Sequence, residues 1–219
     1  MYRTCMFGSK ILSGEIFENN KFVYNSDLYV DDRNKNIELV NFSMRKLDMS
    51  KAINYATKAL EYDSNYNEVI IELGEYDIIK YLINRDSSET FFLKSFKHEL
   101  ETFTELFKKR KIKIVLMGLT DISADSINEY LKTKYNSDVL LDKHEFSNLV
   151  LKINQIIFSV SARNNIKFVD SQNIITDRFD EFLCNDKGTY KKKVQSEIWN
   201  TAKKLVEIKS LKQLSLLLF

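Results

Sequence analysis

The sequence contains no proline, only five glycines and only two cysteines among its 219 residues. The absence of proline excludes proline-rich linkers and PxxP recognition motifs, and it removes slow X-Pro isomerisation from folding. Cys5 and Cys184 are too few for a disulfide framework and form no Cys-x-x-Cys pair. We therefore expect a protein of a reducing compartment.

Strong charge of one sign is also lacking, because 33 Lys and Arg residues face 31 Asp and Glu residues, for a net charge of +2. This balance argues against a nucleic-acid partner, since nucleic-acid-binding proteins usually carry a basic excess. No stretch approaches the roughly 18 apolar residues of a membrane span, and residues 1–14 lack the apolar run of a signal peptide. We expect a cytoplasmic protein without a membrane span; the sequence predicts no oligomeric state.

Short apolar runs and helical patterns alternate along the chain. The runs are rich in β-branched residues, as buried parallel strands are, and lie at residues 2–7, 36–41, 68–73, 112–117 and 166–170. Apolar residues three or four positions apart predict helices at residues 49–62, 96–107, 149–160 and 190–206. Residues 22–30 are an extra extended piece or a loop. The alternation predicts one α/β domain over residues 1–219, a three-layer α/β/α sandwich with a five-stranded parallel sheet.

Three of the five glycines, Gly8, Gly74 and Gly118, directly follow predicted strands. The carboxyl ends of parallel strands form the edge at which open α/β sheets bind ligands. Glycine at this edge either lets a ligand approach the backbone or simply permits a sharp turn. Three such residues in a glycine-poor chain favour a binding site at this edge.

The segments that follow these strands resemble the sequence blocks of SGNH/GDSL hydrolases. Residues 6–14 are similar to the Gly-Asp-Ser block and residues 40–46 to the Asn-x-Ser-x-x-Gly block. Residues 69–77 are similar to the Gly-x-Asn-Asp block, and residues 180–190 to the Asp-x-x-His block before the final helix. The resemblance covers nearly the whole chain. It implies a flavodoxin-like sheet in strand order 2-1-3-4-5 and hydrolysis of esters of lipids, small acyl groups or acetylated sugars.

The positions that give this family its name hold other residues in this chain. By the resemblance, Lys10 stands at the nucleophile and Leu183 at the base histidine. Lys46 and Tyr76 stand at the oxyanion-hole glycine and asparagine, while Asp180 matches the supporting acid. The other matching positions are Gly8, Asn41, Gly74, Asp77 and Gly188.

These replacements bear directly on chemistry. Acyl transfer by a serine needs a base within hydrogen-bond reach and donors aimed at the developing oxyanion, and leucine cannot accept a proton. The two histidines, His98 and His144, lie in charged stretches and are predicted to be surface residues. A standard Ser-His-Asp mechanism is therefore not expected.

One hypothesis is a protein that either lacks catalysis or uses a repurposed site, and that binds a small anionic or acylated ligand, a sugar or a lipid. Lys10 is expected at a strand-to-helix turn, where helix amides favour anions. Lys46 would add charge and Tyr76 a hydroxyl donor, making a pocket for a phosphate, carboxylate or sugar phosphate. Alternatively, the two lysines point into solvent or pair with Asp48 or Asp180. The candidate ligand-binding residues are Gly8, Ser9, Lys10, Asn41, Lys46, Gly74, Tyr76, Asp77 and Leu183.

Two further hypotheses remain open. One is an active esterase in which Ser9 or Ser13 is the nucleophile and a lysine is the base, with Ser9, Lys10 and Asp180 as candidate catalytic residues. The other is a structural or interaction module whose crevice is filled by side chains. The sequence contains no phosphate-binding loop, no dinucleotide fingerprint and no His/Cys cluster, so we predict no cofactor and no metal.

Overall fold

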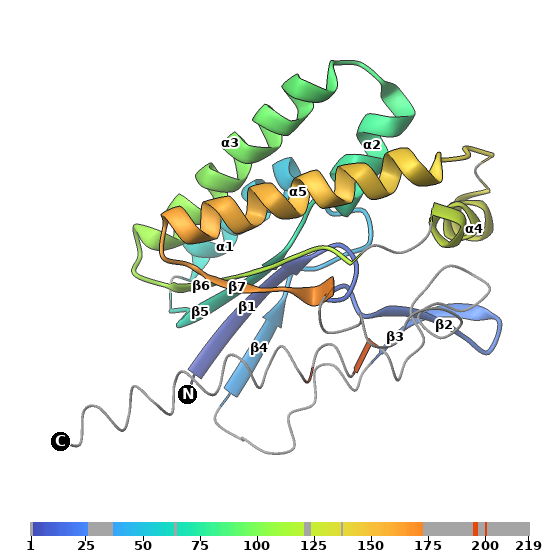
Figure 1. Ribbon diagram of the computed structural model, residues 1–219. Coiled ribbons are helices and arrows are strands. Elements are labelled where there is room, and N and C mark those ends of the chain that lie inside the picture. Colours follow the sequence, from blue (N-terminus) through green and yellow to red (C-terminus); the bar gives the residue numbers. More distant parts are fainter. Residues whose placement is uncertain are drawn as a thin grey trace.

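Five parallel strands form the central sheet of this protein. The computed structural model describes residues 2–25, 37–63, 65–120, 124–136, 138–172, 195, 196 and 200 (Figure 1). The strands are β1 (Tyr2–Gly8), β4 (Ile37–Asn41), β5 (Glu68–Glu72), β6 (Lys113–Met117) and β7 (Lys167–Val169). They pair in the order β4-β1-β5-β6-β7, which confirms the predicted order 2-1-3-4-5 and the predicted α/β class.

Both faces of the sheet are buried, as the continuous apolar runs predict for parallel strands. Phe7, Ile71 and Leu116 pair across β1, β5 and β6 and point into the core beneath the helices. The preceding row of paired residues points to the opposite face because side chains alternate along a strand. Its members are also buried, with exposed fractions of 3% or less: Met6, Ile70 and Val115.

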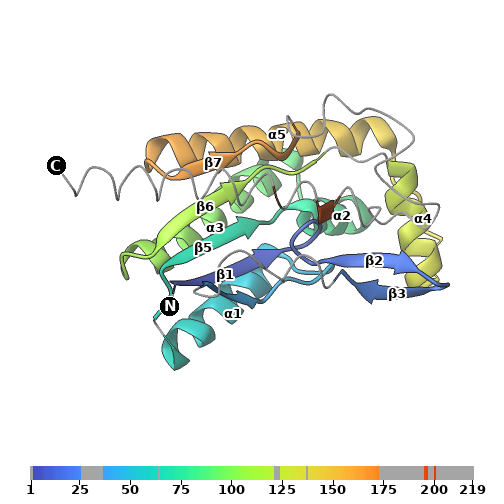
Figure 2. The same ribbon diagram turned by 90° about the horizontal axis from the view of Figure 1, so that it is seen from below.

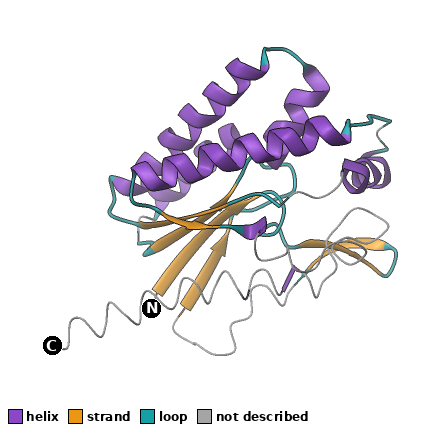
Figure 3. Cartoon of the chain, viewed as in Figure 1, coloured by secondary structure: helices purple, strands orange, loops and turns teal. Residues whose placement is uncertain are grey.

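Three long helices cover one face of this sheet: α1 (Met49–Tyr62), α3 (Glu89–Lys108) and α5 (Lys143–Arg163) (Figures 1 and 3). Each begins after a side chain that accepts a hydrogen bond from a backbone N–H in its first turn, and these capping residues are Asp48, Ser88 and Asp142. The helix predicted at 49–62 is confirmed with these bounds. Those predicted at 96–107 and 149–160 are longer than their apolar stripes, because they begin earlier in the chain, directly after the caps Ser88 and Asp142.

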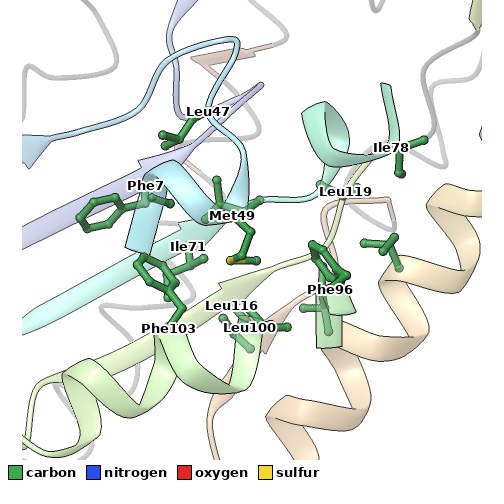
Figure 4. Close-up of a cluster of buried hydrophobic side chains, with 14 of the residues drawn as sticks. Phe7, Leu47, Met49, Ile71, Ile78, Phe96, Leu100, Phe103, Leu116 and Leu119 are labelled. Atoms are coloured by element: carbon green, nitrogen blue, oxygen red, sulfur yellow. The ribbon is translucent and has the colours of Figure 1, made fainter. Parts of the chain in front are cut away.

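Aromatic residues fill the centre of the helix-covered core (Figure 4). The ring of Phe7 meets the edge of Phe103 at a centroid distance of 5.3 Å and stacks on Phe42 at 5.0 Å. Phe7 and Phe103 are each about 1% exposed or less. This packing fixes the end of β1, and therefore the position of the residues that follow Gly8.

The segment after β1 differs from the prediction, because no helix begins there. Residues 9–13 form a turn closed by a hydrogen bond from Gly14 N to Ile11 O of 3.2 Å, and Gly14 has a positive φ of 71°. The antiparallel hairpin of β2 (Glu15–Glu18) and β3 (Lys21–Tyr24) follows directly. Lys10 therefore lies in a strand-to-hairpin turn, which supplies no helix N-terminus.

Two shorter helices and the strand β2 were not predicted from the sequence. The helices are α2 (Glu75–Asn84) and α4 (Ala124–Tyr135). Of the predicted extended piece at 22–30, residues 22–24 belong to β3, whereas residues 26–30 lie outside the described part of the chain. Of the helix predicted at 190–206, only residues 195, 196 and 200 are described.

Candidate functional site

The candidate site lies at the carboxyl edge of the sheet, where β1, β4, β5 and β6 end (Figure 2). Backbone hydrogen bonds join the segments that leave this edge. Ser9 N donates to Glu72 O over 3.1 Å, and Met44 N donates to Gly8 O over 3.0 Å. The segments of the first three sequence blocks therefore meet in space.

Lys10 is buried at this edge, with 1% of its side chain exposed. Its Nζ lies 3.1 Å from Oε2 of Glu75 and donates a hydrogen bond to Thr120 O over 2.9 Å. The Glu75 side chain is 2% exposed. Lys10 therefore does not point into solvent, and among the described residues its ion pair is with Glu75, the first residue of α2, and not with Asp48.

Arg45 shares the carboxylate of Glu75 with Lys10. Its Nη1 lies 3.2 Å from Glu75 Oε1, and its guanidinium lies over the ring of Tyr130, 4.3 Å from the centroid. Burial opposes the charge of Arg45, but Glu75 and Tyr130 outweigh this effect and raise the pKa of the guanidinium. Arg45 therefore remains a cation inside the protein, although the sequence had not singled it out.

The two candidate nucleophiles lie in different surroundings. Ser13 Oγ donates a 2.7 Å hydrogen bond to Lys10 O, so its hydroxyl proton is engaged in the turn. Ser9 is fully buried, and its Oγ has no hydrogen-bond partner among the described residues. Ser9 is thus the one of the two whose hydroxyl is not tied to the backbone.

Glu72 holds the turn that carries these residues. Its two carboxylate oxygens accept hydrogen bonds of 2.9 Å from the backbone N–H groups of Ile11 and Leu12. Burial raises the pKa of Glu72 to about 7, although the two amides work in the opposite direction. A Cβ on Gly8 would lie 2.6 Å from Leu12 Cβ and 2.8 Å from Glu72 Oε2. Gly8 is therefore required for close packing of the protein itself.

The second block contributes Asn41 and Lys46. Asn41 accepts a 2.9 Å hydrogen bond from Ser43 N and donates one of 3.2 Å to Leu12 O, so that it links two segments of the edge. The Nζ of Lys46 lies 3.3 Å from the centroid of the Tyr135 ring. Lys46 therefore rests on the Tyr135 ring of α4, whereas Lys10 pairs with Glu75.

The third block contributes Gly74, Tyr76 and Asp77 at the start of α2. Gly74 has a φ of 128°, and a Cβ there would lie 3.0 Å from Ile153, so both conformation and packing favour glycine. Tyr76 is half-buried. Asp77 accepts a 3.0 Å hydrogen bond from Met49 N, and burial raises its pKa to about 7. Asp77 therefore joins α2 to the start of α1.

A cap formed by the β2–β3 hairpin and α4 lies beyond the carboxyl edge (Figure 2). Tyr130 of α4 donates a 2.7 Å hydrogen bond to Glu15 Oε1, and Lys134 forms an ion pair with Glu15. The ring of Phe22 meets the Tyr130 ring edge-on at 5.6 Å. Because Arg45 also packs on Tyr130, the cap is connected directly to the buried charges of the site.

The two histidines take no part in the contacts of this edge described above. Both histidines are exposed, on α3 and in the first turn of α5, in agreement with their prediction as surface residues: His98 and His144. Other candidates lie outside the described residues: Asp180, Leu183 and Gly188. Whether Lys10 and Leu183 share one cleft stays a prediction.

Sequence reasoning overlooked the acidic residues of the edge, Glu72 and Glu75. Glu72 is an acid at the end of an otherwise apolar strand, and Glu75 follows Gly74 immediately. A carboxylate in such a position must find donors inside the protein, because burying an unpaired charge is costly. This signal was present in the sequence.

The described residues show no group of three or more His, Cys, Asp or Glu side chains able to hold a metal ion. Among the helices of the described part, none combines the length and apolar character needed to cross a bilayer.

Comparisons with known proteins show a relationship in fold. No protein-family model and no curated protein matches the sequence. A psychrotrophic esterase, EstA from Pseudoalteromonas sp., superposes with a TM-score of 0.60 at 16% identity, covering 93% of this chain and 98% of that chain. A GDSL-like lipase from Bacteroides thetaiotaomicron gives a TM-score of 0.63 at 14% identity, covering 94% and 88%.

A carbohydrate acetylesterase, Est24 from Sinorhizobium meliloti, gives a TM-score of 0.67 at 9% identity and covers 95% of this chain and 100% of that chain. Identities this low establish architecture alone. The strand order, the parallel sheet and these superpositions together show that the chain has the fold of the SGNH/GDSL esterases and lipases.

Proposed function

We propose that this protein is a non-catalytic member of the SGNH/GDSL hydrolases that binds a small anionic or acylated ligand at the carboxyl edge of its sheet. The observation that carries the proposal is the buried ion pair between Lys10 and Glu75. By the resemblance, Lys10 occupies the nucleophile position. Family membership rests on the fold together with the resemblance of the four blocks.

The ion pair removes the lysine as a base. The Lys10 ammonium pairs with Glu75 and donates to Thr120 O, and an ammonium has no free electron pair with which to accept a proton from a serine. The exposed histidines His98 and His144 lie on α3 and α5, whereas Ser9 is fully buried. No histidine among the described residues is therefore suited to activate Ser9.

Hydrolysis of a graded set of nitrophenyl esters, from acetate to octanoate, tests the proposal. We expect the wild-type protein to release nitrophenol no faster than the Ser9→Ala variant does. The matched control is Ser161→Ala, which removes a hydroxyl from α5 that donates to Phe158 O. A wild-type rate that falls in Ser9→Ala but not in Ser161→Ala would refute the absence of catalysis.

The second candidate function is an active ester hydrolase with Ser9 as nucleophile. One observation favours it, namely that Ser9 Oγ has no hydrogen-bond partner among the described residues and lies directly after Gly8. This candidate requires a base from outside the described part of the chain. The ester assay decides between the two candidates, because only this one predicts turnover that depends on Ser9.

A further inference from the structure

The exposed face of α5 carries a regular series of uncharged residues. Within this helix, which the structure describes in full, the exposed residues between Glu145 and Arg163 recur at intervals of three or four positions: Asn148, Leu151, Gln155, Phe158 and Ala162. We call these five residues the α5 stripe. Leu151 and Phe158 are large apolar side chains with exposed fractions of 58% and 57%. Alternating intervals of three and four are typical of a helix that packs along a second helix.

The other two helices that cover the sheet differ from α5 in the charge of their exposed faces. The exposed residues of α1 include Lys51 and Glu61, and those of α3 include Lys94 and Glu105. Charged residues make up 29% of the sequence, and the solvent-facing side of a helix is where they normally gather. The α5 stripe instead has the composition of a contact surface, since the central parts of interfaces are depleted in charged residues.

The charged side chains along the stripe are paired within the chain. Lys152 is the only charged residue between Glu145 and Arg163, and it forms an ion pair with Glu89 of α3. Glu145 forms an ion pair with Arg85. The result is an uncharged band about 21 Å long, since an α-helix rises about 1.5 Å per residue. A strongly charged partner would gain little from this band, whereas a second uncharged helix face would match it.

We propose that the α5 stripe is the contact surface of a homodimer, in which α5 of a second copy packs antiparallel to it about a two-fold axis at Gln155. In each direction from Gln155 the stripe has a large apolar residue and then a smaller one. The axis therefore places Leu151 beside Phe158 of the second copy, and Asn148 beside Ala162. A two-fold contact requires a surface that complements itself, and this order of residues meets the requirement. The helix lies at the margin of the helical layer beside the edge strand β7, away from the cap (Figure 2).

Sedimentation velocity of the full chain, from about 1 µM to about 300 µM, tests for the dimer. A contact between one pair of helices is small for a specific interface, so we expect a weak dimer with a dissociation constant in the micromolar range. Leu151→Glu should weaken it at least about tenfold, because the new carboxylate would be buried against Phe158 of the second copy without a counter-charge. Leu151 is more than half exposed, so this variant should fold. The matched control is Phe91→Glu on α3, where the side chain is 65% exposed, and it should leave the dissociation constant unchanged.

Cysteine crosslinking tests the position of the two-fold axis. The experiment uses a chain with Cys184→Ser, in which the remaining native cysteine, Cys5, is buried. Gln155→Cys in this chain should form a disulfide-linked dimer under mild oxidation, because residue 155 faces its own copy across the axis. The matched control is Asn148→Cys, which is exposed on the same stripe but would lie about 21 Å along the helix from its own copy, so it should not crosslink.

A chain that stays monomeric over the whole concentration range overturns the proposal. A dimer that Leu151→Glu and Phe91→Glu weaken equally, or that neither weakens, also overturns it, because the contact then lies elsewhere. Crosslinking through residue 148 but not through residue 155 rejects the antiparallel arrangement. The dimer is independent of the proposed function, since none of these variants alters a residue of the carboxyl edge.

Discussion

Replacing Lys10 with methionine should strongly destabilise the protein. Methionine resembles the lysine stem in volume but leaves Glu75 without the ammonium 3.1 Å away. Breaking a buried ion pair by removing one partner costs about 3–5 kcal/mol. Arg45 still contacts Glu75 at 3.2 Å in this variant, so we expect a loss near the lower limit, about 3 kcal/mol.

Glu75→Gln should cost more, about 5 kcal/mol, because it removes the carboxylate that Lys10 and Arg45 share. In the double variant Lys10→Met/Glu75→Gln the two losses should not add, since residues in one ion-pair network couple by about 0.5–3 kcal/mol. Urea unfolding at neutral pH, followed by circular dichroism, gives the free energy of unfolding for each protein.

The control for this cycle is Lys94→Met on the exposed surface of α3, which should change the free energy of unfolding by no more than about 0.5 kcal/mol. If Lys10→Met behaves like Lys94→Met, Lys10 is solvated. If the double variant loses the sum of the two single losses, Lys10 and Glu75 are not coupled. Either result would refute the ion-paired edge.

Two further predictions concern Glu72 and Gly8. Burial raises the folded-state pKa of Glu72 from 4.5 to about 7, so its stabilising contribution is complete below about pH 4.5 and is lost as the pH rises to 7. In the wild type, this titration should lower the free energy of unfolding by about 3 kcal/mol between about pH 4.5 and 7, and Glu72→Gln should abolish that loss. Urea titrations at several pH values measure it. The same pH profile in the variant and the wild type would contradict the raised pKa. Gly8→Ala should cost about 2–3 kcal/mol, because its Cβ would lie 2.6 Å from Leu12 and 2.8 Å from Glu72. Gly118→Ala, whose nearest contact would be 3.2 Å, should cost less, and equal losses in thermal unfolding would show that the turn adjusts freely.

The sheet could be predicted because its strands carry their own signal. The runs at residues 2–7, 68–73 and 112–117 are apolar throughout most of their length and become β1, β5 and β6 within one residue at each end. Buried parallel strands must be apolar on both faces, so that composition alone identifies them. The helix at 49–62 was equally clear, because its buried residues recur on one face.

The hairpin and the two short helices could not be read in the same way. The strands β2 and β3 are four residues long, too short for a periodic pattern to stand out. The helix α4 buries only a short apolar stripe, Ile127, Tyr130 and Leu131, and Tyr130 also makes tertiary contacts with Arg45 and Glu15. Such contacts join segments far apart in the sequence and leave no local signature.

The sequence predicted which residues meet at this edge of the sheet, but it did not predict how their charges pair. The resemblance of the blocks brought Gly8, Lys10, Asn41 and Gly74 to one edge, and contacts of the described residues place them there. The sequence suggested lysines presented to an anion, whereas Lys10 pairs with Glu75 inside the protein and Lys46 rests on Tyr135. The electrostatic potential of a site depends on which charged side chains pair in the folded protein. The sequence lists these side chains but does not show how they pair.

The most direct test of the absence of catalysis is intact-mass measurement after incubation with a reactive fluorophosphonate, which attaches covalently to an activated serine whatever the natural substrate. We predict an unchanged mass, because Lys10 is engaged with Glu75 and Thr120 and no described histidine reaches Ser9. An increase by one phosphonyl group in the wild type that is lost in Ser9→Ala would contradict this account.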